Sequence, residues 1–322
     1  MTNPNSVTCH DVIIIGSGLS GITAARILHQ QGRDCLVLDK GRRIGGRCST
    51  KRKDGMTFNH GAQFFTAKDH SFQALVQEAK TQNAIASWSF GHHSESFIGA
   101  PTMRDFISYL AKDIRVEQDA KITHIIREDS LYHLQDEAGL SYYARHIICT
   151  IPAPQAASLI EVAAPSLVPT ALSATYDPCW TVMLALKDAV TGDGFPIRDH
   201  GDIGWANYEP LRLGDAPQTP YGPAVTIQAS QQASHHMLSW QAEDVIATMT
   251  DKLEQVTKTK LEVQFSLAHR WLYARVATPA KADLPFANDD QSFVLAGDYF
   301  SAARLEAAYL SGKRAAHALA QL

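Results

Sequence analysis

The sequence has 322 residues and a formal net charge of −4, and its 45% apolar and 19% charged residues are ordinary for a globular chain of one or two domains. Such a charge gives no indication of binding to nucleic acid or to an anionic membrane. No apolar run could span a bilayer, no signal peptide is recognisable, and the five scattered cysteines form no zinc motif, so we expect a reduced, cytoplasmic protein.

The first predicted unit is a strand, a glycine-rich turn and a helix. Residues 12–15 are a β-branched run typical of a buried strand. Gly16, Gly18 and Gly21 follow in G-x-G-x-x-G spacing, which predicts a tight turn, backbone contact with a pyrophosphate and close packing of the helix over 22–30. A second buried strand ends at Asp39, about 20 residues after the turn, where a carboxylate can bind a ribose. This pattern predicts a dinucleotide site and leaves NAD and FAD equally open.

The loop "DKGRRIGGRCST" at residues 39–50 is unusually basic and flexible. Gly45 and Gly46 would let the backbone lie against a cofactor, in dihedral angles closed to other residues. Arg42 and Arg47 could donate charge-assisted hydrogen bonds to phosphate. For Arg43 an exposed surface charge is an equally good interpretation.

The middle of the chain leaves the nucleotide unit and then returns to it. Apolar spacing predicts a helix over 101–114, and three short strands near 121–127, 130–135 and 141–150 suggest a β-meander. An antiparallel sheet with one helix is predicted further on, from strands at 180–186, 203–208, 224–230 and 263–275 and a helix at 241–256. The last unit is a strand at 293–296, then Gly297 and Asp298, then a helix from about Arg304.

Four segments together resemble the FAD-dependent amine oxidase superfamily, and in finer detail its renalase-like flavoproteins. They are the loop at 39–50, "FNHGAQFFT" at 58–66, "HRWLYAR" at 269–275 and the C-terminal stretch at 294–316. The resemblance implies an α/β protein with a Rossmann-type FAD-binding domain, as in amine oxidases and p-hydroxybenzoate hydroxylase, and a substrate domain of antiparallel sheet plus helix. We expect the FAD-binding domain at 1–65, 101–154 and 291–322, and the substrate domain, or lid, at 66–100 and 155–290.

The resemblance implies FAD as the cofactor. We expect it to be non-covalent, because no cysteine lies near 297–309, where some family members attach the flavin. The helix beginning near Arg304 would place its positive end at the flavin ring. The residues expected to bind FAD are Gly16, Gly18, Leu19, Ser20, Gly21, Asp39, Lys40, Arg42, Gly45, Gly46, Arg47, His60, Gly61, Ala62, Gln63, Ile122, Thr150, Gly297, Asp298, Arg304, Leu305 and Glu306.

Because the flavin carries the redox step, the protein mainly positions the substrate. In the family the segment containing Gln63 passes beside the flavin, although Gln63 could instead satisfy a buried backbone group. Strand alternation puts four residues of 268–275 on one face, of which Trp271 could equally be core. Our catalytic candidates are Gln63, His269 and Trp271, and our substrate-contacting candidates are Phe65, Trp180, Tyr273 and Arg275.

One departure from the family bears on the reaction. Many amine oxidases carry a lysine on the first long lid strand, where this chain has Trp180 and Thr181 and only Lys187 at the far end. This departure disfavours a simple amine oxidase mechanism. The renalase-like resemblance implies instead oxidation of misreduced 2- and 6-dihydro isomers of NAD(P)H, with hydride transfer to flavin N5 and reduction of O2 to hydrogen peroxide. Arginines available for the substrate phosphates are Arg198, Arg212, Arg270 and Arg275.

Two alternatives stay open. One is an oxidase or dehydrogenase acting on a small amine, and the other is a flavin-binding protein without turnover. We expect a small-molecule substrate and O2 as partners, neither nucleic acid nor membrane, and a monomer or homodimer. The histidine pairs at 92–93 and 235–236 have no surrounding carboxylates, so we expect no metal.

Overall fold

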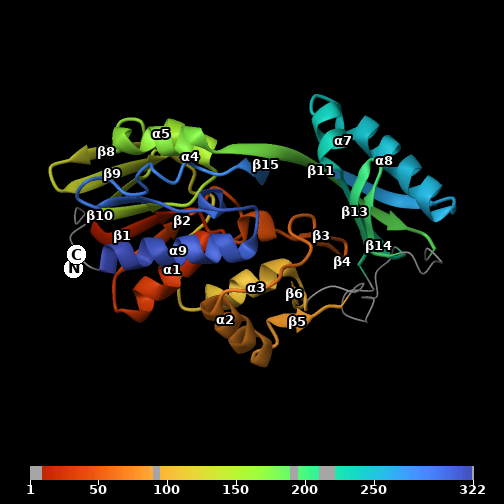
Figure 1. Ribbon diagram of the computed structural model, residues 1–322, viewed down its shortest axis with the longest axis horizontal. Helices are drawn as coiled ribbons and strands as arrows, with labels where there is room; N and C mark the ends of the chain where they lie inside the picture. The colour runs from red at the N-terminus through yellow and green to blue at the C-terminus, as the bar shows by residue number, and fades with distance from the viewer. Residues whose placement is uncertain (1–8, 90–94, 189–194, 210–221, 321–322) are drawn as a thin grey trace.

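The computed structural model describes residues 9–89, 95–188, 195–209 and 222–320. Figure 1 shows two parts, a layered α/β part and a smaller antiparallel sheet carrying two helices. We call them the nucleotide domain and the lid. Two long strands, β11 (Thr175–Leu186) and β15 (Val263–Thr278), pair with each other and run from one part into the other.

The nucleotide domain is built on a seven-stranded sheet with β1 (Cys9–Ile15) near its centre. β1 pairs in parallel with β2 (Cys35–Leu38) and with β10 (Ser141–Cys149). β7 (Arg115–Glu117) extends the sheet beyond β2, and β16 (Phe293–Leu295) pairs in parallel with β10. β8 (Ile122–Glu128) and β9 (Leu131–Asp136) complete an antiparallel meander with β10, which confirms the predicted one.

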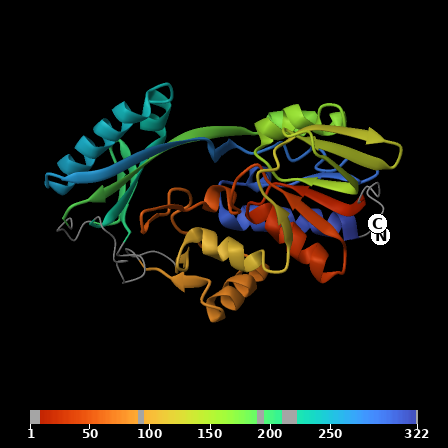
Figure 2. The same cartoon turned by 180° about the vertical axis from the view of Figure 1, so that it is seen from behind.

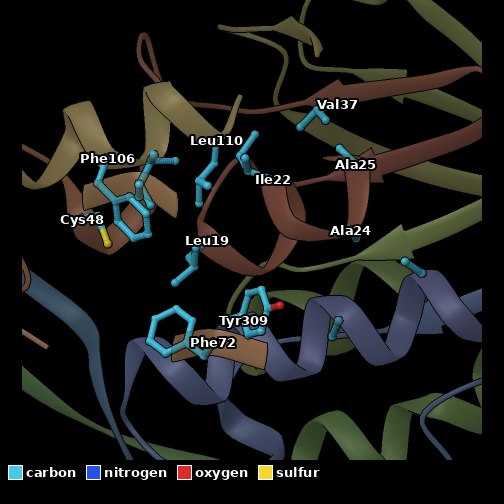
Figure 3. Close-up of a cluster of buried hydrophobic side chains, with 14 of the residues drawn as sticks. Leu19, Ile22, Ala24, Ala25, Val37, Cys48, Phe72, Phe106, Leu110 and Tyr309 are labelled. Carbon is cyan, nitrogen blue, oxygen red and sulfur yellow. The ribbon is translucent and has the colours of Figure 1, made fainter. Parts of the chain in front are cut away.

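Helices cover both faces of this sheet because successive residues of β1 point in opposite directions. Val12 and Ile14 pack toward α1 (Leu19–Gln30) and α9 (Leu305–Ala320). Figure 3 shows this cluster, in which side chains of α1 also meet α2 (His70–Thr81) and α3 (Met103–Leu110). Ile13 and Ile15 pack on the other face against α4 (Ala153–Ile160) and α5 (Val168–Ser173). Figure 2 shows from behind the two layers of helices, one on each side of the sheet.

The lid sheet has the order β12 (Ile197–His200), β13 (Ile203–Tyr208), β14 (Ala224–Ala229), β11, β15, and every pair is antiparallel. Its outer face packs against α7 (Gln231–His236) and α8 (Ala242–Thr257). The stripe of Val245, Met249 and Leu253 meets alternate residues of β11 there. Two short antiparallel pairs lie between β2 and α3 in the chain. They are β3 (Lys51–Lys53) with β4 (Met56–Phe58), and β5 (Ile85–Ser87) with β6 (Phe97–Gly99).

The packing differs from the expected domain boundaries at two segments. Residues 66–100 were expected in the lid, but Phe72, Val76 and Phe97 are buried in the same cluster as Val12 and Ile14. Likewise α4 and α5 lie beyond position 155 and still pack on the nucleotide sheet. Sequence patterns identify a buried helix face without identifying the core that buries it, so these boundaries could not be read from periodicity.

Within the described residues, no helix is long and apolar enough to cross a membrane. The five cysteines are free thiols. His235 contacts the Asp177 carboxylate at 2.8 Å, and no group of three histidine, cysteine or acidic residues is placed to hold a metal in the part of the chain that the structure describes. The pair at 92–93 lies outside that part.

The placement of α2 predicts the effect of Phe72→Ala. Phe72 is fully buried, with its ring centroid 5.0 Å from that of Tyr309. Truncating it should lower the free energy of unfolding by about 3–5 kcal/mol, measured by urea denaturation. Leu172→Ala, at a side chain that is 65% exposed, should change it by no more than about 0.5 kcal/mol. Equal effects of the two changes would contradict the packing described for residues 66–100.

Candidate active site

A cavity of about 590 Å³ lies between the nucleotide domain and the lid. It is lined by residues from the whole length of the chain: Gly18, Leu19, Ser20, Gly45, Arg47 and Cys48; Gly61, Ala62, Gln63, Phe64, Phe65 and Thr66; Thr150; Cys179, Arg198, Asp199, Gly204, Trp205, Gln228, Trp271, Ala274 and Arg275; Gly297, Asp298, Ala303, Arg304, Leu305 and Ala308. A larger groove of about 700 Å³ runs along α9, and none of the predicted site residues lines it. We therefore take the interdomain cavity as the site.

The three glycines of the turn have different tasks. Gly16 has φ +107°, and a Cβ on it would approach Thr150 Oγ1 to 2.7 Å. A Cβ on Gly21 would lie 2.0 Å from the Gly16 carbonyl oxygen, so the packing of α1 requires that glycine. Gly18 has an ordinary φ of −72°, and a Cβ there would have no atom within 4 Å. Gly16 and Gly21 therefore shape the turn, and Gly18 faces the cavity.

The start of α1 fits a phosphate group. Ser20 lines the cavity and is only 5% exposed, and its hydroxyl has no hydrogen-bond partner among the described residues. The first backbone N–H groups of a helix also lack partners within the helix and carry its positive dipole end. A buried hydroxyl donor beside these N–H groups, next to the open side of Gly18, is the set of groups that a pyrophosphate needs.

Asp39 connects the turn to the basic loop. Its carboxylate accepts hydrogen bonds from the Ser17 backbone N–H at 2.6 Å, the Ser17 hydroxyl at 2.7 Å and the Gly41 N–H at 2.6 Å. It does not line the cavity, so its contact with a ribose stays a prediction. Lys40 and Arg42 are exposed and also lie outside the cavity lining.

The glycine pair of the basic loop packs on the turn. Gly45 and Gly46 have φ values of +120° and +52°, and the Gly45 N–H donates to the Ser17 carbonyl oxygen at 3.0 Å. A Cβ on Gly46 would lie 3.2 Å from the Gly18 Cα. Gly45 lines the cavity, whereas Gly46 supports the turn from behind.

Arg47 and Asp298, both predicted to contact the cofactor, also contact each other. The guanidinium donates two hydrogen bonds to the carboxylate, at 2.8 and 2.6 Å. The Asp298 side chain is 6% exposed and that of Arg47 33% exposed. Burial opposes the charge on Arg47, but the adjacent Asp298 carboxylate outweighs it and raises the pKa of Arg47. The cavity thus holds a tightly paired, nearly neutral group at this point.

The segment 61–66 forms one wall of the cavity, as expected for Gly61, Ala62, Gln63 and Phe65. Gln63 is buried and its amide nitrogen donates to the carbonyl oxygens of Asn59 and Gly61. It therefore satisfies backbone groups while also lining the cavity, which combines the two interpretations of this residue. His60 lies outside the lining, and burial together with the neighbouring His269 lowers its pKa to about 3.

Trp271 lines the cavity, and His269 does not. The Trp271 indole N–H donates to the His60 carbonyl oxygen at 3.0 Å, and its ring centroid lies 4.4 Å from that of His269. Burial lowers the pKa of His269, so both imidazoles are neutral near pH 7. His269 therefore sits behind Trp271, where it can fix the indole but touches no cavity surface.

Two substrate candidates lie outside the cavity for reasons of strand geometry. On β15, Trp271 pairs with Cys179 and Arg275 pairs with Asp177, so a bulge breaks the expected alternation. Ala274 and Arg275 consequently line the cavity, while Tyr273 packs edge-on against Tyr176. On β11, Trp180 faces the outer lid core and donates its indole N–H to the Met237 carbonyl oxygen at 2.8 Å.

Some of the remaining predicted residues line the cavity, and others lie away from it. Thr150, Gly297, Arg304 and Leu305 line the cavity, so the N-terminal end of α9 does reach the site. Ile122 is buried in β8, away from the cavity. Glu306 instead accepts hydrogen bonds from the N–H groups of Lys68 and Asp69, at 2.6 and 2.7 Å.

Of the four arginines predicted to be available for the substrate phosphates, two line the cavity. Arg198 and Arg275 line the cavity. Arg270 lies on the outer face, with its guanidinium 5.6 Å from the centre of the Trp180 ring. Arg212 lies outside the described residues.

Sequence reasoning missed most of the lid's contribution. Cys179, Trp205 and Gln228 line the cavity from the inner face of the lid sheet. Burial raises the pKa of Cys179, with Arg275 opposing, so it is a neutral thiol. One signal was present in β14, where polar Thr226 and Gln228 alternate with apolar Val225 and Ile227 although the strand is almost fully buried. Such alternation marks a strand face that meets something other than an apolar core.

These features are those of a dinucleotide-binding domain with a separate lid. Residues 14–79 match an NAD(P)-binding Rossmann-like domain, and residues 85–320 match flavin containing amine oxidoreductases. The chain belongs to the flavin containing amine oxidoreductase family. This confirms the expected FAD-dependent oxidoreductase of the amine oxidase superfamily, with non-covalently bound FAD as its cofactor. The glycine turn, Ser20 and the start of α1 are suited to hold the pyrophosphate of that cofactor.

Two solved structures share the fold over nearly the whole chain. A putative protoporphyrinogen oxidase from Exiguobacterium sp. 255-15 superposes with a TM-score of 0.74 and 14% identity, covering 98% of this chain and 99% of that one. Cyclohexylamine oxidase from Brevibacterium oxydans IH-35A gives a TM-score of 0.72 and 14% identity, with 97% and 99% covered. At these identities the likeness concerns the fold.

Curated relatives match over short stretches. The inactive all-trans-retinol 13,14-reductase of Danio rerio is 30% identical over 105 residues, which cover 32% of this chain and 17% of the relative. Putrescine oxidase of Kocuria rosea is 38% identical over 68 residues, covering 21% and 14%. The chain thus spans less than a fifth of the length of these curated relatives, and none of them transfers its substrate to this chain.

The open side of Gly18 predicts a separation of cofactor binding from folding. Gly18→Ala has an allowed φ and meets no protein atom, so the flavin-free protein should unfold as the flavin-free parent does. Its affinity for FAD should fall, measured by flavin fluorescence on titration. Gly21→Ala, the matched control, should lower stability, because its Cβ overlaps the Gly16 carbonyl oxygen. Unchanged FAD affinity in Gly18→Ala would refute this placement of the pyrophosphate.

Arg47→Ala should cost the protein much of its bound FAD. The change leaves the buried Asp298 carboxylate unpaired and removes the cation from the cavity wall. We expect the purified variant to lose most of its yellow colour, measured as the ratio of absorbance at the flavin band to that of protein. Arg43→Ala, at an exposed position of the same loop, is the control and should keep its flavin. A normal flavin content in Arg47→Ala would show that the loop does not hold the cofactor.

Proposed function

We propose that the chain is a renalase-like oxidase that converts 2- and 6-dihydro isomers of NAD(P)H to NAD(P)+. The observation that carries this proposal is the charge of the cavity. Four arginines line it against two aspartates, and one of those aspartates, Asp298, is paired with Arg47. Arg47 and Arg304 lie on the nucleotide side with the expected FAD contacts, whereas the lid strands contribute Arg198 and Arg275 against Asp199. This excess of positive charge on the lid favours a substrate that carries phosphates and disfavours an ammonium ion.

The glycine turn, Ser20 and the start of α1 would hold FAD, which would supply the redox chemistry as a hydride acceptor at N5 that O2 can reoxidise with release of hydrogen peroxide. A dihydronicotinamide ring is already a hydride donor, so the chain has to orient it rather than activate it. The flat indole of Trp271, fixed by its hydrogen bond to the His60 carbonyl oxygen, offers a surface against which such a ring can lie. The neutral His60 and His269 add no charge behind this surface.

The first long lid strand supports the same choice. Its cavity side carries Cys179, and the next residue on that side is Thr181. Lys187, at the far end of the strand, is exposed and contacts the Glu262 carboxylate at 3.0 and 3.1 Å. The lysine found on this strand in many amine oxidases therefore has no counterpart on β11.

A second candidate is an oxidase of a small amine, which the family membership favours. The cavity also has an aromatic wall, with Phe64, Trp205 and Trp271 lining it. Aromatic faces attract cationic amines. The two candidates thus rest on opposite features of one cavity, its arginines and its aromatic rings.

Anaerobic reduction of the bound flavin separates these candidates. We expect 2- and 6-dihydronicotinamide nucleotides to bleach the flavin absorbance within seconds, and air to restore it with formation of hydrogen peroxide. Putrescine and cyclohexylamine serve as amine donors, and ordinary NADH as the control for unspecific hydride transfer. Bleaching by the amines alone would establish the amine oxidase instead, and no bleaching by any donor would leave a flavin-binding protein without turnover.

A further inference from the structure

One cavity arginine is held in a distinctive way. The guanidinium of Arg198, on β12, lies 5.9 Å from the ring centre of Phe64 and 5.8 Å from that of Trp205. The two rings are 5.2 Å apart, and Trp88 packs edge-on against both. Phe64 and Trp88 come from the segment packed on the nucleotide domain, whereas Trp205 comes from the lid. One ring from each part, Phe64 and Trp205, therefore lies beside one cation at the cavity wall.

Stacking and anion binding use different parts of a guanidinium. An aromatic ring attracts a guanidinium through its charge and its flat faces, while the N–H groups of a guanidinium lie in its plane and point outward. A stacked guanidinium is also restricted in its rotamers, so less conformational entropy is lost when it forms a bidentate contact. Arg198 is exposed and also lines the cavity, so its guanidinium lies at the solvent-facing opening of the cavity, which we call the cavity mouth.

The other lining arginines are placed differently. Arg47 gives its paired N–H groups to Asp298, and Arg304 precedes α9 on the nucleotide side. Arg275 lies on β15 opposite Asp177, at the bulge. Among the lining arginines that the structure describes, only Arg198 lies on β12, which is an edge strand of the lid sheet.

We propose that Arg198 binds a phosphate group of the substrate at the cavity mouth and so selects phosphate-bearing dihydronicotinamides over their ribosides. This inference rests on the proposed function and specifies the part of the substrate that the lid recognises. Asp199 lines the same mouth with the opposite charge, so it opposes binding of the phosphate. Its φ of +47° is one that asparagine also adopts readily, so Asp199→Asn can remove this charge without straining the backbone.

The direct experiment compares nicotinamide mononucleotide with nicotinamide riboside, which differ by the phosphate. Isothermal titration calorimetry on the FAD-loaded protein measures their binding as reaction products, without turnover. Arg198→Met should weaken binding of the mononucleotide about 10- to 100-fold, the usual effect of losing a hydrogen bond to a charged group, and should not weaken binding of the riboside. Arg198→Lys, which keeps the charge but loses the planar fork, should fall between, and Asp199→Asn should bind the mononucleotide more tightly.

Arg270→Met is the matched control. Arg270 is also a lid arginine stacked on an indole, that of Trp180, but it lies on the outer face and donates to the Leu238 carbonyl oxygen at 2.6 Å. Its loss should leave the affinities for both ligands unchanged. Flavin content measured on each variant shows that the cavity is still assembled.

The outcomes separate this inference from the proposed function. Equal affinity of the parent protein for mononucleotide and riboside, or an unchanged mononucleotide affinity in Arg198→Met, overturns the phosphate site. If the dihydronicotinamide riboside still bleaches the flavin in that case, the proposed function stands without the site. If no dihydronicotinamide bleaches the flavin but the mononucleotide binds in an Arg198-dependent way, the phosphate site stands and the proposed reaction falls.

Discussion

The site depends on one guanidinium that joins three remote parts of the chain. Arg47 follows the glycine pair of the basic loop, binds Asp298 beyond β16, and lies against Tyr176 and the Ala274 carbonyl oxygen of the two connecting strands. Its bidentate pair with a nearly buried carboxylate resists separation, because either charge left alone would be poorly solvated. The start of the nucleotide domain, its end and the root of the lid are thereby held around one cavity.

The nucleotide half could be predicted because its signals are local. Gly16, Gly18 and Gly21 act within one strand–turn–helix unit, and the structure shows in detail why two of them tolerate no side chain. The basic loop at 39–50 and the C-terminal Gly297 and Asp298 were predicted as cofactor contacts from the resemblance to the amine oxidase superfamily, because sequence spacing alone does not bring them to the site. Their direct contact with one another could not be derived from spacing, because it joins positions at opposite ends of the chain.

The lid half was less predictable because strand faces depend on register. β13, β14 and α8 were predicted to within one residue, β11 and β15 were predicted too short, and β12 and α7 were not predicted. The sides of the strands were harder still, because Trp180 and Cys179 exchange sides with a shift of one position. On β15 the bulge between Trp271 and Arg275 turns Tyr273 away from the cavity. Neither feature leaves a mark in hydrophobic alternation. Substrate candidates taken from the aromatic content of these strands were therefore divided between the cavity and the outer core.

The border between the two parts is where specificity can arise. The nucleotide domain supplies Phe64 and Trp88, the lid supplies Trp205, and the rings pack together beside Arg198. Because Asp298 already compensates Arg47, the lid determines much of the charge that an incoming molecule meets. A cationic amine would be drawn by the rings and repelled by the guanidinium, whereas a phosphate would find both its counter-charge and a rigid donor. The same few side chains thus set opposite preferences, and the sign of the substrate's charge decides between them.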